Sequence, residues 1–435
     1  MHLPNLRVLA CLNARAFRNA PPSGYDIAGT FLRWTFLRAV FHRGYVLVSG
    51  LYFVIIAHLS ATQIVVLATV MSLTLGLSDV PTGVWSDAFS RKWPLVIGHG
   101  LLAAGMMMTG LVTAYPLIVV TQVLWGLGWA FSSGADVAWL TDELARPDRI
   151  DRLLTTRARR DLAGSAAGLL GFGLLAWACG LATAVVLSGA GMAVAGVFVA
   201  LWFAEDNFTP VAERLWSASL SIFRRGLTLS LRDREIRLVL AATMIINGAG
   251  VVSSLFPRQL VDVGFAGDPI PWYTGILIVA FGAGALALRF VEARIHGAGV
   301  ARRTYALACV LGGAGLVVLA RAPDAVVGGL GILLASGIAF NVTRAVSVVW
   351  VNRRTTSDVR ATVHSFLSQA ECAGEVVGGA GLAVVARTAG ISAALVTSGT
   401  LFACTAAIVA CSRGDRLSPS AGWRPRPGRG PVRPP

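Results

Sequence analysis

The ionisable residues best placed to carry a proton lie in an apolar stretch near the end of the chain. Four polar residues there follow one another at positions i, i+4, i+7 and i+11: His364, Ser368, Glu371 and Glu375. This spacing places them on one face of a helix. Ionisable groups inside a membrane are costly and mark either a pathway or a buried ion pair. Glu371 therefore has three interpretations: proton carrier, partner of Arg344 on the preceding apolar stretch, or direct substrate contact.

A second set of residues at helical spacing could form the wall of a binding site. Its members are Trp125, Trp129, Ser132, Asp136 and Trp139. Aromatic faces beside one acid suit an amphipathic or cationic organic molecule, and Asp136 is also a candidate for carrying a proton. The alternative is that the tryptophans pack or face lipid while Asp136 pairs with Arg43.

The elements that must position these residues are long apolar segments. Hydrophobic residues make up 55% of the chain and charged residues 14%, against about a quarter charged in soluble proteins, and the mean hydropathy is +0.68. This composition predicts an all-α membrane protein whose spans need about 20 residues each. Scanning at that length predicts about twelve spans, near 37–58, 62–82, 93–114, 117–140, 162–182, 183–204, 238–257, 272–290, 304–321, 325–350, 361–386 and 391–411.

The distribution of basic residues predicts the orientation, because Lys and Arg accumulate on the cytoplasmic side of short loops. If both termini are cytoplasmic, only three of the 37 Lys and Arg residues fall in outside loops, Arg258, Arg321 and Arg387, and Arg344 lies deep within a span. The net charge of +15 then faces the anionic cytoplasmic leaflet. No nucleic-acid partner is needed to explain it.

Two weak internal matches indicate that the chain repeats itself. GWAF at Gly128 recurs as GIAF at Gly337, and AGSAAGLLG at Ala163 recurs as AGEVVGGAG at Ala373. Both matches fall on the fourth and fifth predicted spans of each half. They predict two six-helix bundles in parallel repeat, related by an axis along the membrane normal.

The predicted organisation has five parts. They are a cytoplasmic N-terminal segment (1–36), an N-terminal bundle (37–204), a cytoplasmic linker (205–237), a C-terminal bundle (238–412) and a disordered basic tail (413–435). Within the linker, apolar residues at helical spacing predict an amphipathic helix on the membrane surface: Trp216, Leu220, Phe223, Leu227 and Leu231. A plain linker with accidental periodicity is the alternative.

The short loop between the second and third spans, GVWSDAFSRK, has a recognisable pattern. Its Gly83, Asp87, Arg91 and Lys92 resemble the signature loop of the major facilitator superfamily. Twelve spans in two halves are also similar to that family, so the likeness covers nearly the whole chain. The pattern departs from the family at three positions: Trp85, Ala88 and Ser90.

The resemblance implies a role for this loop as a latch between the two halves. In the family the acid, here Asp87, meets the start of the eleventh span, near Arg360. The arginine, here Arg91, meets an acid at the end of the fourth span, which is Asp142 or Glu143. Gly83 is expected to let two helix ends approach closely. The alternative is that the basic pair only anchors the topology.

The resemblance also implies a central cavity lined by the first, fourth, seventh and tenth spans. This adds Asn247, Asn341 and Arg344 to Arg43, Trp129 and Asp136 as candidates for contacting the substrate. The expected function is a secondary active transporter that moves a small organic solute by alternating access, coupled to protons. Drug-exporting relatives carry a glycine-proline element, and GSAAGLLGFG at Gly164 has the glycines without the proline, which favours export of amphipathic or drug-like compounds.

Other functions find less support in the sequence. A membrane scaffold or sensor that keeps the fold without transporting is the rival interpretation. No nucleophile constellation indicates an enzyme, and no GxxxxGK[ST] loop indicates ATP as a driving force. The Cys and His residues stand mostly alone, so no metal or other cofactor is expected. A single lysine, Lys92, against many arginines predicts a bacterial inner-membrane protein, and the resemblance implies a monomer.

Overall fold

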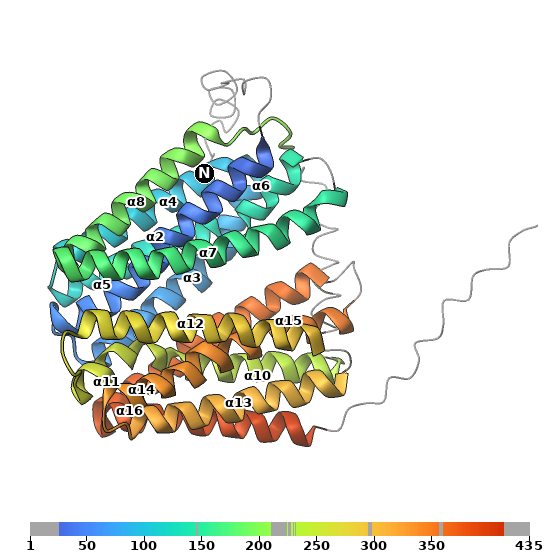
Figure 1. Ribbon diagram of the computed structural model, residues 1–435. Coiled ribbons are helices and arrows are strands. Elements are labelled where there is room, and N and C mark those ends of the chain that lie inside the picture. The colour runs from blue at the N-terminus through green and yellow to red at the C-terminus, as the bar shows by residue number, and fades with distance from the viewer. Residues whose placement is uncertain are drawn as a thin grey trace, which may run out of the picture.

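The protein is helical throughout the part that the computed structural model describes, residues 26–144, 147–209, 224, 228, 230, 232–294, 298–355 and 360–412. Its helices form two groups, one above the other in Figure 1. The first comprises α2 (Ile27–Ile55), α3 (Ala61–Phe89), α4 (Lys92–Leu111), α5 (Tyr115–Ser132), α6 (Ala135–Leu144), α7 (Pro147–Cys179) and α8 (Leu181–Trp202). The second comprises α10 (Arg234–Gly250), η1 (Val251–Leu255), α11 (Phe256–Val263), α12 (Pro269–Arg294), α13 (Ala298–Ala320), α14 (Ala325–Ile332), η2 (Leu333–Ala339), α15 (Phe340–Arg354) and α16 (Arg360–Cys411).

Helix ends and breaks follow from local sequence. Ser60 begins α3 with a capping box, in which its hydroxyl accepts from the Gln63 N–H at 3.3 Å and Gln63 Oε1 accepts from the Ser60 N–H at 2.8 Å. Gly134, at φ +74°, separates α5 from α6 within one predicted span. Gly390, at φ +87°, interrupts α16. Both glycines occupy the left-handed region, which other residues rarely adopt.

Ten helical segments among the described residues are long and apolar enough to cross a membrane. The last of them, Thr362–Cys411, contains the eleventh and twelfth predicted spans on either side of Gly390. α2 is not among the ten, because its arginines and His42 lower its hydropathy. The chain is a multi-pass membrane protein, while the count of twelve spans and the orientation of the termini stay predictions.

Two helices begin well before the spans that the sequence predicts. α2 starts at Ile27 rather than near 37, because Asp26 Oδ1 caps it by accepting from the Gly29 N–H at 3.0 Å. Phe31 and Trp34 in this first part are fully buried in a cluster with residues of α4, α6 and α8. α7 likewise starts at Pro147 rather than near 162. Hydropathy locates the lipid-crossing part of a helix and misses polar turns that are buried by protein.

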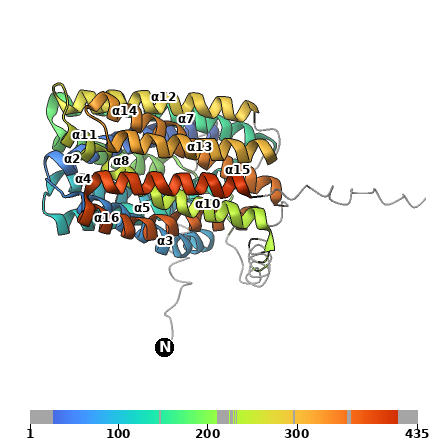
Figure 2. The ribbon, with the colours of Figure 1, turned by 90° about the horizontal axis from the view of Figure 1, so that it is seen from below.

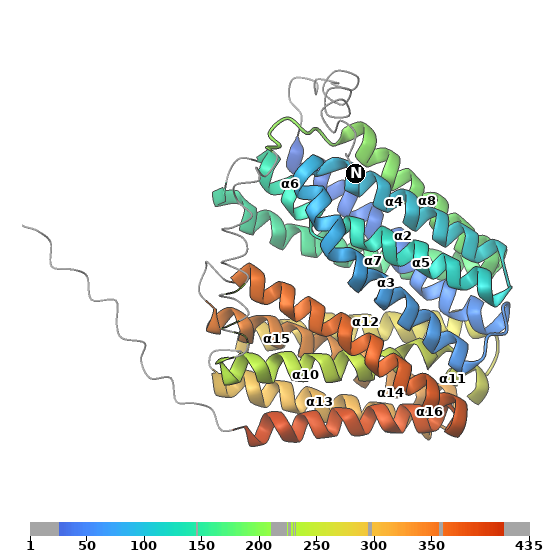
Figure 3. The same ribbon diagram turned by 180° about the vertical axis from the view of Figure 1, so that it is seen from behind.

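The two groups touch along α3 with α16 and along α7 with α12. Contacts between them run from the α2–α3 turn, where Arg258 donates to the Leu59 carbonyl at 3.4 Å, along α3 to Gly76, which lies against Cys372. Toward the α3–α4 loop the ribbons of the two groups diverge (Figure 1 and Figure 3). Figure 2, which views the second group from below, shows α13, α16 and α10 side by side.

Several predictions fall on residues outside the described part. These are the terminal segment before residue 26, the linker positions Trp216, Leu220, Phe223, Leu227 and Leu231, and the tail from 413 onward. The proposed amphipathic helix and the division into five parts therefore stay predictions.

Candidate functional site

Asp136, at the start of α6, is a buried acid between two arginines. Its side chain is 4% exposed; it pairs with Arg157 of α7 and lies 3.7 Å from Arg38 of α2. Its other carboxylate oxygen accepts from the Val137 N–H at 2.8 Å. The predicted partner of Asp136 was Arg43, and that pairing is wrong. Arg157 takes its place because α7 extends past its apolar part into a stretch that the sequence suggested was a loop.

Arg43 faces the second group of helices instead. Its guanidinium carbon lies 5.7 Å from the ring centroid of Phe281 on α12, a distance typical of a cation–π contact. Its Nε is buried and has no hydrogen-bond partner. Arg43 therefore remains a candidate for contacting a substrate.

The aromatic wall is smaller than the sequence predicts. Trp125 and Trp129 are half-buried and flank His42 of α2, with ring centroids 5.6 Å and 4.8 Å from it. Trp139 instead stacks on Phe203 in the protein core, at 4.0 Å, and is fully buried. The break at Gly134 rotates the residues that follow it off the face that Trp125 and Trp129 share.

Two acids on α16 occupy the contact between the two groups of helices. Glu371 Oε2 lies 3.6 Å from a guanidinium nitrogen of Arg344, the partner that one interpretation of the sequence gave it. Glu375 Oε2 accepts from the hydroxyl of Ser72, on α3 of the other group, at 2.6 Å. Asp79 of α3 and Cys372 of α16 lie close enough to this cluster to interact electrostatically. Polar side chains from both groups, Ser72 and Glu375, therefore meet at one place.

The remaining residues predicted to contact a substrate donate hydrogen bonds to backbone carbonyls of their own helical segments. Asn247 donates to the Thr243 carbonyl at 2.8 Å. Asn341 donates to the carbonyls of Ser336 at 3.0 Å and Gly337 at 2.7 Å, in the π-helical turn η2. Such turns leave carbonyls poorly paired and are common at functional sites. His364 hydrogen-bonds Asn352 at 2.7 Å, so it lies apart from the acids with which it shares a helical face.

The α3–α4 loop forms part of the predicted charge network. Arg91 pairs with Asp87 and, through Nε at 3.4 Å, with Asp142 of α6. The start of α16 near Arg360, the predicted partner of Asp87, has side chains outside the described residues. Among the described residues nothing lies within 4 Å of a Cβ built at Gly83, so the close approach of two helix ends expected there stays a prediction.

Sequence reasoning missed Glu205, and it offered Glu143 as a partner of Arg91 rather than of the segment after α8. Glu205, just after α8, accepts from the Ser90 hydroxyl at 2.7 Å, from the Lys92 N–H at 3.0 Å and from the Arg91 N–H. Glu143 accepts from the backbone N–H groups that follow Glu205, at 2.9 Å each. The acids in the sequence WFAEDN were the available signal, but no spacing rule links them to a loop more than a hundred residues away.

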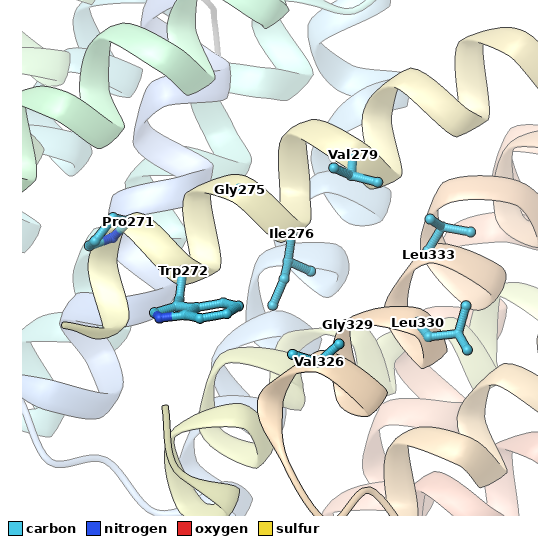
Figure 4. Close-up of a pocket in the computed structure, with 9 residues that line it drawn as sticks. All are labelled: Pro271, Trp272, Gly275, Ile276, Val279, Val326, Gly329, Leu330 and Leu333. Atoms are coloured by element: carbon cyan, nitrogen blue, oxygen red, sulfur yellow. The ribbon is translucent and has the colours of Figure 1, made fainter. Parts of the chain in front are cut away.

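A groove on the second group lies away from these charges. It measures about 590 Å³ and runs between α12 and the α14–η2 segment. Apolar side chains and glycines line it (Figure 4): Pro271, Trp272, Gly275, Ile276, Val279, Val326, Gly329, Leu330 and Leu333. Because it offers no charged group, we do not assign the site there. No group of three or more His, Cys, Asp and Glu side chains in the described part could hold a metal ion.

Comparison with known proteins places this arrangement in a family. No curated protein matches the sequence. Among solved structures, a mutant of the nucleoside transporter NupG has a TM-score of 0.72 and 15% identity, covering 88% of this chain and 98% of that one. A POT family transporter in complex with 5-aminolevulinic acid has a TM-score of 0.67 and 11% identity, covering 88% and 95%.

A bacterial homolog of the human lysosomal transporter Spinster, in an inward-facing and unoccupied conformation, has a TM-score of 0.62 and 13% identity, covering 88% of this chain and 94% of that one. At these identities the likeness concerns the fold. The family model for the Major Facilitator Superfamily matches residues 25–379, which is most of the chain. The chain belongs to the Major Facilitator Superfamily.

Proposed function

We propose that this protein is a secondary active transporter that moves a small organic solute by alternating access and couples it to proton binding at Glu371 and Glu375. The observation that carries the proposal is the position of these acids. Glu371 lies 3.6 Å from Arg344, and Glu375 accepts from Ser72 of the opposite group of helices at 2.6 Å. A proton on Glu371 would weaken its pair with Arg344, and a proton on Glu375 would change a contact between the two groups. Proton binding is thereby linked to their separation.

The α3–α4 loop is the proposed latch between the two groups of helices, at the end of the molecule away from the α2–α3 turn. Arg91 already pairs with Asp87 and Asp142, and the two groups of helices diverge here (Figure 1). We infer that this end is cytoplasmic, as the basic residues predict, and that the structure corresponds to an inward-open state. Closing this end would bring Asp87 to the start of α16.

Direction, location and assembly rest on the sequence and on family resemblance. The glycine-rich stretch at Gly164 favours export of amphipathic or drug-like compounds, the arginine-rich composition favours a bacterial inner membrane, and the fold favours a monomer. None of these adds a cofactor or an ATP requirement to the proposal.

A transport experiment with matched variants tests this function. Cells expressing the wild type, Glu371→Gln, Glu375→Gln or Asp262→Asn receive amphipathic cations, organic anions and small zwitterions, with and without a protonophore. Asp262 is the control, because it is an acid paired only with Arg258 one turn away on its own helix. We expect the distribution of at least one compound to depend on expression and to lose this dependence with the protonophore.

Each variant separates two interpretations of the acids. Loss of flux at normal protein abundance in Glu371→Gln supports coupling, whereas loss of abundance indicates that the pair with Arg344 is structural. If an abundant wild-type protein changes the distribution of none of the compounds, the scaffold interpretation replaces the transporter.

A further inference from the structure

Three buried nitrogen atoms on α2 and α5 have no hydrogen-bond partner among the described residues: His42 Nε2, Arg43 Nε and Trp125 Nε1. The rings of His42 and Trp125 stack, with centroids 5.6 Å apart and planes at 6°, and Arg43 is the residue of α2 that follows His42. Indole and guanidinium N–H groups can only donate, and buried donors in folded proteins are nearly always satisfied. The Trp125 and Arg43 N–H groups therefore lack an acceptor, while His42 Nε2 can donate or accept according to its tautomer.

The features that would attract a cation at this site are already occupied. The acid Asp136 is 4% exposed and paired with Arg38 and Arg157. The guanidinium of Arg38 also lies 4.9 Å from the ring centroid of Trp129 and 5.4 Å from that of Trp34. A cationic ligand would therefore find Asp136 already paired and would compete with Arg38 for the rings of Trp129 and Trp34.

Positive charge remains in excess around α2, α6 and α7. Arg38, Arg43 and Arg157 are located there, and the nearby acids are Asp136 and Asp161. Three positive charges against two negative ones leave one positive charge uncompensated. Arg43 has the nitrogen without a partner, so it is the group best placed to bind an additional anion.

A second arginine approaches from the other group of helices. The side chain of Arg344 is 75% exposed and touches Glu371 only at 3.6 Å, so most of its five donors are open. Asn341, one turn before it on α15, lies against Gly284 of α12. Phe281, one turn before Gly284, is the ring under Arg43. Arg43 and the turn that carries Arg344 thus approach the same short part of α12 from opposite groups.

We propose that the transported solute is an organic anion, an apolar or aromatic body that bears one carboxylate, sulfonate or phosphate group. Its acidic oxygens would accept from Trp125 and Arg43, and Arg344 would add charge from the opposite group. The proposal rests on the transport function given above and names the substrate class for it. It departs from the cationic molecule that the aromatic residues alone suggested.

Three compounds with one indole ring and different charge test the proposal. Purified full-length protein in detergent is titrated with indole-3-acetate, indole-3-acetamide or tryptamine, and thermal unfolding reports binding through the rise in Tm. We expect indole-3-acetate to raise the Tm at lower concentration than the amide, and tryptamine to have no effect. An equal or larger rise with tryptamine, or no rise with any of the three, would overturn the proposal.

Variants locate the anion in the same assay. Trp125→Phe keeps an aromatic ring beside His42 but removes the N–H together with part of the indole, so it should weaken indole-3-acetate binding by about 10-fold. Arg43→Gln should weaken it by about 10- to 100-fold, while Arg43→Lys should recover part of the loss. Arg387→Gln, which removes another exposed arginine, is the control. Unchanged binding in both Trp125→Phe and Arg43→Gln would contradict this location.

The two proposals fail in different ways. If indole-3-acetate binds as expected but proteoliposomes do not carry it in response to a proton gradient, the substrate class stands and proton-coupled transport fails. If the proteoliposomes carry tryptamine in response to that gradient and do not carry indole-3-acetate, transport stands and the substrate class fails.

Discussion

Replacing Asp136 by Asn distinguishes a structural counter-charge from a proton carrier. The Asp136 carboxylate is 4% exposed and balances Arg157 and Arg38, which are 26% and 16% exposed. Breaking a buried ion pair by removing one partner costs about 3–5 kcal/mol. Because both arginines retain some solvent contact, screening lowers this cost, and we expect the free energy of unfolding to fall by about 2–3 kcal/mol.

The assay is denaturant unfolding of purified protein in detergent, for the wild type, Asp136→Asn, Arg157→Gln and the double variant. The double variant keeps only Arg38, which lies 4.9 Å from the centroid of Trp129, so it should be about 1 kcal/mol more stable than Asp136→Asn alone. Asp268→Asn, at an exposed acid outside this charge cluster, controls for the loss of an acid. Stability of Asp136→Asn within about 0.5 kcal/mol of the wild type, together with transport that no longer responds to a protonophore, would refute the counter-charge role.

Two further predictions concern the backbone at Gly134 and the hydrogen bonds by which Glu205 holds the α3–α4 loop. Gly134→Ala forces a side chain into the left-handed region and should lower unfolding free energy by about 1–2 kcal/mol. Gly171→Ala, at a helical position where a Cβ meets open space, should change it by less or raise it by up to about 1 kcal/mol; equal losses in both would contradict strain at Gly134. Glu205→Gln should cost about 1–2 kcal/mol, since its bonds to Ser90 and to the start of α4 lose their charge. Asp206→Asn is the matched control, and equal losses in the two variants would contradict the role of Glu205 in holding the α3–α4 loop.

The sequence predicted those features that follow from apolar length and from helical spacing. It located the long helices, and it offered Arg344 as a partner of Glu371 and Asp142 as one of two partners for Arg91. It could not find Arg157 as the partner of Asp136, because hydropathy marked the start of α7 as a loop. It placed Trp139 beside Trp129, because one helical period was extended across a break that depends on a single glycine, Gly134.

Residue spacing in the sequence could not predict contacts between segments that are far apart in the chain. Glu205 reaches the α3–α4 loop only because the end of α8 is packed beside it, and that position depends on buried residues of several helices. The same limit applies to Ser72 and Glu375, which meet across the two groups. Each side chain can be recognised in the sequence as polar within an apolar stretch, but its partner cannot.

An anionic solute would also determine how proton and solute binding affect each other. Arg344 would then serve both Glu371 and the solute, so a proton on Glu371 frees Arg344 for the anion, and by reciprocity the bound anion favours that proton. Proton and anion would move in the same step, and one proton with one monovalent anion carries no net charge.

Movement of proton and anion in one step is independent of the membrane potential, whereas an inside-negative potential drives an unaccompanied anion outward by about 2.3 kcal/mol per charge per 100 mV. Transport of indole-3-acetate that ignores the potential in the wild type would place proton and anion in one step. A dependence on the potential that appears in Glu371→Gln would then show the anion moving alone. Together these two results would identify Glu371 as the residue that balances the charge of the solute.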